Sequence, residues 1–325
     1  MRNLEVRIRR TPATAGDFEV VPGEVPRLTN GGILCRARWL TADPFTCLPA
    51  GDAPQPHRGP QPGDVVPALG VCEVLESRHD VFAVGQHVVV DCGMREMCVS
   101  DGHHVCALHP GQSPASTALG LLGPSGMAAY FGLLDLAQLR AGEVILVSAA
   151  ANVAGAMAGQ VARIKGARAI GIGGSREKCD WATRHARFSA CVSDHAENLS
   201  NRLRQLAPRG FDVYFDNSGG DLLETLLSGR HVGPGGRIIL NSVRHDDPSE
   251  LLRRAGYAPG EITVQRVEAA NYEHRRGEFL KDAIHWYGAD RLVCREDVAD
   301  GLENAPAHLI KAMRGENFGR PLIRL

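Results

Sequence analysis

A turn rich in small residues at 148–160 is the first candidate for chemistry, and it follows the apolar run 143–147. Backbone N–H groups can approach a phosphate only where side chains are small. The N-terminus of a helix adds unpaired donors and a partial positive charge. The turn therefore predicts a site for the pyrophosphate of a dinucleotide, with a tightly packed Ala/Gly helix as the alternative. Its central residues are Asn152, Val153, Ala154 and Gly155.

Asn152 occupies a position where such a turn usually has glycine. Asparagine is among the few residues that tolerate a positive φ, so it fits a position that requires one. We expect Gly155 to permit close approach of the ligand. The small residues that should let the helix lie close against its sheet are Ala156, Ala158, Gly159 and Ala162.

A second loop, at 171–178, begins about 20 residues after Gly155, where a dinucleotide site contacts the adenosine ribose. An NAD site usually has an acidic residue here, but this loop contains Ser175, Arg176 and Lys178. Two cations suit a 2′-phosphate, so the loop predicts NADPH. The alternative is that Arg176 and Lys178 are surface residues at a helix start.

Acid–base candidates lie near the end of the chain. His245 titrates near neutral pH, and the carboxylates of Asp246 and Asp247 could orient it. The hydroxyl of Tyr272 could protonate an enolate. The alternatives are a solvated loop around His245 and a packing role for Tyr272.

Cysteines and histidines between positions 92 and 109 could suggest zinc: Cys92, Cys98, His103, His104, Cys106 and His109. However, the Cys-x2-Cys pair of a structural site is missing, and no Gly-His-Glu segment occurs at 61–70. We therefore expect no metal, and interpret the group as buried thiols and surface histidines. Cys47 could be a reactive thiol or a small buried residue.

The elements that would position these residues change character along the chain. Short apolar runs separated by turns in the first hundred residues predict antiparallel strands. From Arg140, apolar strands alternate with small-residue helices, which is typical of a parallel sheet covered by helices. Its expected strands are 143–147, 169–172, 191–192, 211–215 and 237–240. A helical stretch at 305–313 and a final strand at 321–325 could return to the first domain.

Composition excludes several classes of protein. A formal net charge of -1 over 325 residues gives no reason to expect a nucleic acid partner. No apolar run approaches the roughly 20 residues that span a bilayer, and the first residues lack the apolar core of a signal peptide. The nine scattered cysteines indicate reduced thiols. We expect a cytoplasmic protein without a membrane partner.

With these motifs, the chain resembles the medium-chain dehydrogenase/reductase superfamily, in the zinc-independent branch of prostaglandin, 2-alkenal and curcumin reductases. The resemblance covers nearly the whole chain. It implies an α/β protein with a GroES-like β-rich domain at 1–120, completed by the tail 288–325, and a Rossmann NADP-binding domain with a doubly wound parallel sheet at 121–287. It also implies a homodimer. The matching stretches are 43–45, 129–134, 147–160, 173–179, 212–220, 295–306 and 314–320.

The resemblance assigns roles by position. Asn152 to Gly155 would cover the pyrophosphate of NADPH, and Lys178 would contact its 2′-phosphate. Asn317 would reach the cofactor from the tail. The residues that would hold the nicotinamide half are Asn217, Asn241, Ser242 and Val243. Without the resemblance, Asn217 and Asn317 are ordinary turn formers.

Several positions depart from the family pattern. Asp194 replaces a tyrosine near the 2′-phosphate, where an anion is unfavourable unless Arg176 or Lys178 pairs with it. Phe45 lacks the hydroxyl of the usual tyrosine. Charged residues fill the loop 244–247, and 266–269 replaces an apolar strand. These changes indicate a specialised, more polar substrate.

The expected activity is therefore NADPH-dependent reduction of the activated carbon–carbon double bond of an α,β-unsaturated carbonyl compound, a small molecule. Tyr272 and His245 are the candidate proton donors. One alternative is a cyclase or isomerase that binds NADP(H) without net redox chemistry. Another is a cofactor-dependent binding or regulatory protein.

Overall fold

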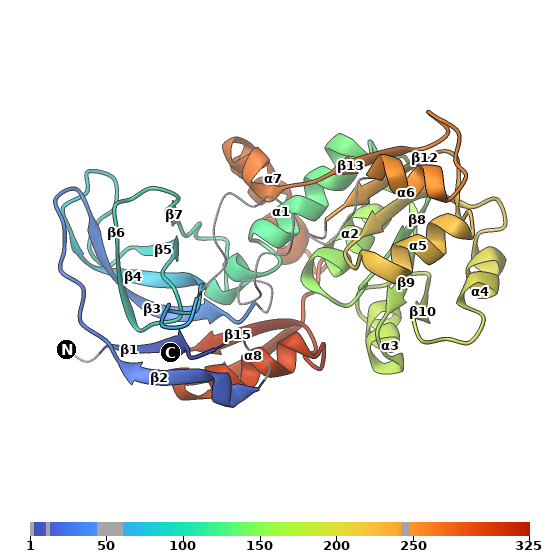
Figure 1. Ribbon diagram of the computed structural model, residues 1–325. Coiled ribbons are helices and arrows are strands. Elements are labelled where there is room, and N and C mark those ends of the chain that lie inside the picture. The colour runs from blue at the N-terminus through green and yellow to red at the C-terminus, as the bar shows by residue number, and fades with distance from the viewer. Residues whose placement is uncertain (1–2, 11–13, 44–60, 242–247) are drawn as a thin grey trace. The chain divides into compact units, whose positions relative to one another are not determined.

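The computed structural model describes residues 3–10, 14–43, 61–241 and 248–325, and it divides into two compact units. Unit 1 contains residues 1–119 and 296–325, and unit 2 contains residues 120–295. Figure 1 shows strands dominating the first and alternating strands and helices in the second. Within the described ranges, every helix is too short or too polar to cross a bilayer.

Unit 1 is built from antiparallel strand pairs, except that β14 and β15 run parallel. β1 and β2 form a two-stranded sheet, while a second sheet has the order β14-β15-β3-β4-β5-β7, with β6 also pairing with β3. The strands are β1 (Leu4–Ile8), β2 (Phe18–Pro22), β3 (Ile33–Thr41), β4 (Leu69–Ser77), β5 (His87–Asp91), β6 (Met97–Ser100), β7 (Cys106–Ala107), β14 (Glu296–Asp300) and β15 (Arg320–Arg324). The helical elements are η1 (Ala15–Asp17), η3 (Ala115–Leu119), η6 (Leu302–Asn304) and α8 (Ala305–Met313).

The C-terminal tail is part of the sheet of unit 1. Leu322 of β15 lies opposite Thr41 of β3, in antiparallel register. Arg320 donates through Nε to the carbonyl of Leu119 (2.9 Å) and forms an ion pair with Asp43 (3.3 Å). Backbone pairing and a half-buried ion pair therefore join the C-terminal strand to the N-terminal part of the chain.

Unit 2 is a parallel sheet with strand order β10-β9-β8-β11-β12-β13, the order 3-2-1-4-5-6 of a Rossmann fold. The strands are β8 (Val144–Val147), β9 (Arg168–Gly173), β10 (Ala190–Ser193), β11 (Phe211–Asp216), β12 (Val232–Leu240) and β13 (Thr263–Arg266). The helices are α1 (Pro124–Phe131), η4 (Gly132–Leu136), α2 (Val153–Ile164), α3 (Arg176–Arg184), α4 (Leu199–Leu206), α5 (Gly220–Ser228), α6 (Pro248–Arg254), η5 (Ala269–Arg275) and α7 (Arg276–Gly288). The predicted fold class is confirmed.

Helix α2 lies close to its neighbours because its buried face consists of small residues. Ala156, Ala158 and Ala162 are each at most 1% exposed. At Gly159 an added Cβ would come within 1.9 Å of Cζ of the buried Phe188 ring. The predicted close packing of this helix is therefore present, and Phe188 sets its limit.

Substituting Gly159 by alanine should destabilise the protein by about 1–3 kcal/mol, because overpacking outweighs the gain in helix propensity. The control is Gly277→Ala in α7, where nothing lies within 4 Å of an added Cβ. That variant should keep or raise the wild-type stability. Chemical and thermal unfolding would measure both variants, and a Gly159→Ala protein as stable as the control would contradict close packing on Phe188.

Candidate functional site

The turn between β8 and α2 is shaped by its own backbone. Ala149 has a positive φ of 48°, and the amide of Ala150 donates to the carbonyl of Ile172 in β9 (2.9 Å). A Cβ on Gly155 would lie 2.3 Å from the Ala149 carbonyl oxygen. The turn itself thus requires glycine at position 155, a reason separate from close approach of a ligand.

Asn152 differs from the expectation of a left-handed backbone. Its φ is −80°, and it is the N-cap of α2, where Oδ1 accepts from the Gly155 N–H (2.6 Å). The residue with positive φ is Ala149, three positions earlier. Asparagine is favoured at an N-cap because its side chain satisfies one of the first amides of the helix. The first two amides of the helix, those of Val153 and Ala154, have no acceptor within the helix. They are therefore suited to bind an anion.

The loop after β9 leads directly into α3. Ser175 is the N-cap of α3, and its Oγ accepts from the Lys178 N–H (3.2 Å). Arg176 is exposed and Lys178 is half-buried. A Cβ on Gly174 would lie 3.8 Å from Oδ2 of Asp194, so this carboxylate borders the same loop. Asp194 also forms an ion-pair contact with His195 (3.6 Å).

A buried carboxylate joins the ends of β8 and β11. Asp216, 0% exposed, accepts from the hydroxyls of Tyr214 (2.5 Å) and Ser148 (3.0 Å). It also accepts from the amides of Ser218 (3.2 Å) and Gly219 (3.0 Å). Burial, together with the charge of Asp216, holds the pKa of Tyr214 well above its usual value. The tyrosine therefore remains a donor to the carboxylate at neutral pH.

Two asparagines extend this network along the edge of the sheet. Asn217 donates its backbone amide to Ser148 Oγ and its side-chain amide to the Ser148 carbonyl, both at 2.8 Å. Asn241, after β12, donates Nδ2 to Oδ1 of Asn217 (2.8 Å). The predicted residues Asn217 and Asn241 are thus in contact at the carboxyl ends of adjacent parallel strands, where ligands bind in open α/β sheets.

Tyr272 lies on η5 and packs against α1. Its ring stacks on Phe131, with centroids 4.4 Å apart and planes at 8°, and its hydroxyl donates to Asp135 Oδ2 (3.2 Å). Arg275 donates to the same carboxylate (3.0 Å) and lies over the Phe131 ring. Burial and the Asp135 charge raise the pKa of Tyr272 above its usual value. The hydroxyl therefore keeps its proton at neutral pH.

The remaining predicted residues divide into two groups. Asn317 belongs to unit 1, where Nδ2 donates to the Gly319 carbonyl (2.8 Å), the bond of a turn former. Ser242, Val243 and His245 lie outside the described residues, as do Phe45 and Cys47.

Two strand ends in the sequence carried a signal for the buried network, although Ser148 and Asp216 were not among the predicted site residues. Ser148 directly follows its apolar strand, and Asp216 ends another. Small polar and acidic residues at strand ends of an α/β sheet indicate a ligand edge. Their pairing depends on β8 and β11 being neighbours, which the strand order establishes.

Possible metal ligands gather at one place in the described part of the chain. There, one group of three His, Cys, Asp or Glu donors lies close together, and it consists of Cys72, Cys92 and Cys98. Cys92 and Cys98 are buried and His103, His104 and His109 are exposed, as expected, but Cys106 is only half-buried. The absence of a zinc site remains a prediction.

Comparison with known families places both parts of the chain. A profile described as the N-terminal domain of oxidoreductase matches residues 4–108. Another, described as zinc-binding dehydrogenase, matches residues 154–285.

Similar proteins cover nearly the full length. The NADPH-dependent curcumin reductase of Escherichia coli (strain K12) is 33% identical, over 95% of this chain and 92% of its own. Prostaglandin reductase 1 of Bos taurus is 32% identical, over 96% and 94%. The crystal structure of CurA from Vibrio vulnificus aligns with a TM-score of 0.89 and 30% identity, over 99% and 98% of the two chains. The chain therefore belongs to the medium-chain dehydrogenase/reductase superfamily, in the branch of the curcumin and prostaglandin reductases.

Proposed function

We propose that this protein uses NADPH to reduce the activated carbon–carbon double bond of an α,β-unsaturated carbonyl compound. The relatives named above are an NADPH-dependent curcumin reductase and a prostaglandin reductase. A CurA structure in complex with NADPH is 29% identical to this chain, with a TM-score of 0.88. The observation that carries the proposal is the start of α3, where Ser175, Arg176 and Lys178 follow the end of β9.

The residues of unit 2 fit the parts of NADPH in order. The amides of Val153 and Ala154, at the start of α2, would bind the pyrophosphate. Ser175, Arg176 and Lys178 would hold the 2′-phosphate through charge-assisted hydrogen bonds. Asn217 and Asn241, together with Ser242 and Val243, would contact the nicotinamide half. Asn317 would contact the cofactor from the tail.

Bound NADPH would supply a hydride to the β-carbon of the substrate. The chain would align the two reacting carbons. A protein group or water then protonates the α-carbon, which restores the carbonyl and leaves a saturated product. Tyr272 is a candidate donor because its hydroxyl carries a proton at neutral pH and already donates a hydrogen bond to Asp135. To act, it would exchange Asp135 for the substrate as its hydrogen-bond acceptor.

Finer features of the proposal rest on the family and on the sequence. We propose a homodimer, because the resemblance implies one, and a cytoplasmic location. The charged loop 244–247 favours a more polar substrate than a simple 2-alkenal. His245 remains the second candidate proton donor.

The purified protein should oxidise NADPH when an α,β-unsaturated ketone or aldehyde is added, in a ratio of one NADPH to one saturated product. Nicotinamide absorbance and product mass would be followed together. Product without loss of absorbance would instead indicate a cyclase or isomerase. Binding of NADPH without any product would indicate a binding protein, and either outcome would contradict a reductase.

Replacing Lys178 by alanine should weaken NADPH binding by about 1–3 kcal/mol, because a charge-assisted contact to the 2′-phosphate is lost. NADH binding should change little, since NADH lacks that phosphate. Calorimetric titration of both cofactors is the measurement, and Lys281→Ala, an exposed lysine on α7, is the control. Equal losses for NADPH and NADH would show that Lys178 does not contact the phosphate.

Removing the hydroxyl with Tyr272→Phe should lower kcat by roughly 10²–10⁴-fold if this group is the acid. The ring remains, so stacking on Phe131 and the unfolding midpoint should be preserved. Activity of the wild type should fall as pH rises through the raised pKa of Tyr272, because the hydroxyl then loses its proton. The variant should lack that alkaline loss, and wild-type turnover in the variant would assign Tyr272 to packing alone.

A further inference from the structure

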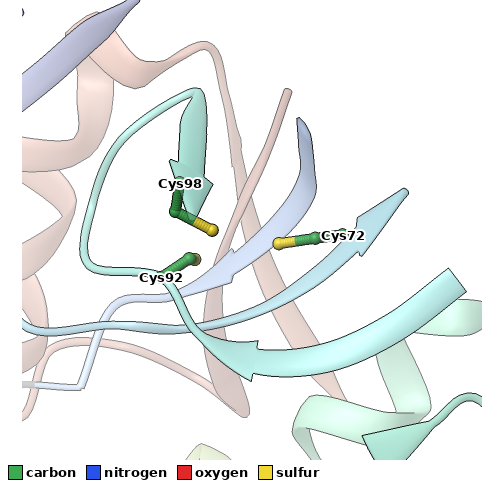
Figure 2. A group of neighbouring side chains, drawn as sticks. All are labelled: Cys72, Cys92 and Cys98. Atoms are coloured by element: carbon green, nitrogen blue, oxygen red, sulfur yellow. The ribbon is translucent and has the colours of Figure 1, made fainter. Parts of the chain in front are cut away.

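Three buried cysteines converge in unit 1, separate from the residues of unit 2 proposed to hold NADPH. Cys72 lies on β4, Cys92 directly follows β5, and Cys98 lies on β6. Their sulfur atoms all lie within 4.8 Å of one another. Figure 2 shows Cys72 and Cys98 pointing toward each other, with Cys92 beside them. The three side chains are only 0%, 3% and 4% exposed.

Strand register brings these thiols together. β3 pairs with both β4 and β6, which places Cys72 opposite Ala37 and Cys98 opposite Cys35. Room for the sulfur atoms exists because position 70 of β4 is glycine. A Cβ there would lie 2.5 Å from Cys92 Sγ and 3.1 Å from Cys72 Sγ.

The surroundings of the cluster offer one cation. Arg95 lies three residues after Cys92 and three before Cys98, and its Nε is buried without a hydrogen-bond partner in the described structure. Cys92 Sγ donates to the carbonyl of Ala68 (3.8 Å), and a metal ion bound to this sulfur would displace that proton.

We propose that Cys72, Cys92 and Cys98 form a three-coordinate thiolate site for Cu(I). The group offers three soft sulfur donors and no imidazole or carboxylate. Thiolate ligands select Cu(I), zinc or iron–sulfur clusters. Structural zinc sites almost always have four ligands. Another thiol, that of Cys35, belongs to the residue opposite Cys98 in the sheet but is not part of the three-sulfur group.

The distances between the three sulfur atoms suit Cu(I) if the side chains move slightly closer together. A metal–thiolate bond of about 2.3 Å puts the sulfur atoms of a trigonal site about 4 Å apart. Binding of the metal releases the thiol protons, so affinity should rise with pH. An ion that binds only the folded state also stabilises it.

The test is an anaerobic titration of the reduced full-length protein with Cu(I), in competition with a colorimetric Cu(I) chelator. One Cu(I) per chain should withstand the chelator, produce a thiolate-to-copper absorption band and raise the unfolding midpoint. The double variant Cys72→Ala/Cys98→Ala should lose at least tenfold in affinity. Cys179 on α3 and Cys191 on β10 form a separate pair of neighbouring thiols in unit 2. The control variant Cys179→Ala/Cys191→Ala removes this pair and should keep the copper.

X-ray absorption of the copper-loaded wild type tests the site without any substitution, so a variant that fails to fold does not decide the outcome. Three sulfur ligands are expected. Two sulfurs, nitrogen or oxygen ligands, or copper retained by the Cys72→Ala/Cys98→Ala variant would overturn the proposal. Preferential retention of Zn(II) over Cu(I) would overturn the three-coordinate assignment, and absence of binding would leave the thiols as packing residues.

Discussion

The buried carboxylate of Asp216 is the interaction on which the candidate cofactor edge depends. A buried charge is costly unless it is hydrogen-bonded, and Asp216 accepts from two hydroxyls and two amides. One hydroxyl belongs to Ser148, at the end of the neighbouring strand. Ser148 in turn accepts from Asn217, and Asn217 contacts Asn241. A single buried acid therefore fixes the ends of β8, β11 and β12 relative to one another.

Local patterns in the sequence predicted much of this architecture. The apolar runs located β8, β9 and β11 to within about one residue, and helix α8 spans the predicted 305–313. Such elements depend on hydrophobic periodicity and small residues, which are visible within a short window. Helix α2 is an example, because its face of Ala and Gly residues can be recognised from the local sequence alone.

Contacts between distant segments were not predictable in the same way. Ser148 and Asp216 are 68 positions apart and meet only because β8 and β11 are adjacent. Cys72 was not grouped with Cys92 and Cys98 because their proximity depends on the register of β3, β4 and β6. The prediction of a positive φ at Asn152 was wrong for a local reason. Asn152 caps α2, and the positive φ of Ala149 forms the turn, so the turn needs no left-handed residue at position 152.

In the proposed function, the charges at the start of α3 would set the balance between the two nicotinamide cofactors. Arg176 and Lys178 would attract a 2′-phosphate, whereas the Asp194 carboxylate, which borders the same loop, would repel it. Exposed charges interact weakly in water and are screened by salt. The distances of the three charged side chains from the phosphate therefore decide the preference between NADPH and NADH.

The most direct measurement is a crystal structure with NADP⁺ bound. The account predicts the 2′-phosphate against Lys178 and Arg176, with the nicotinamide beside Asn217 and Asn241, and a 2′-phosphate directed away from Lys178 and Arg176 would contradict it.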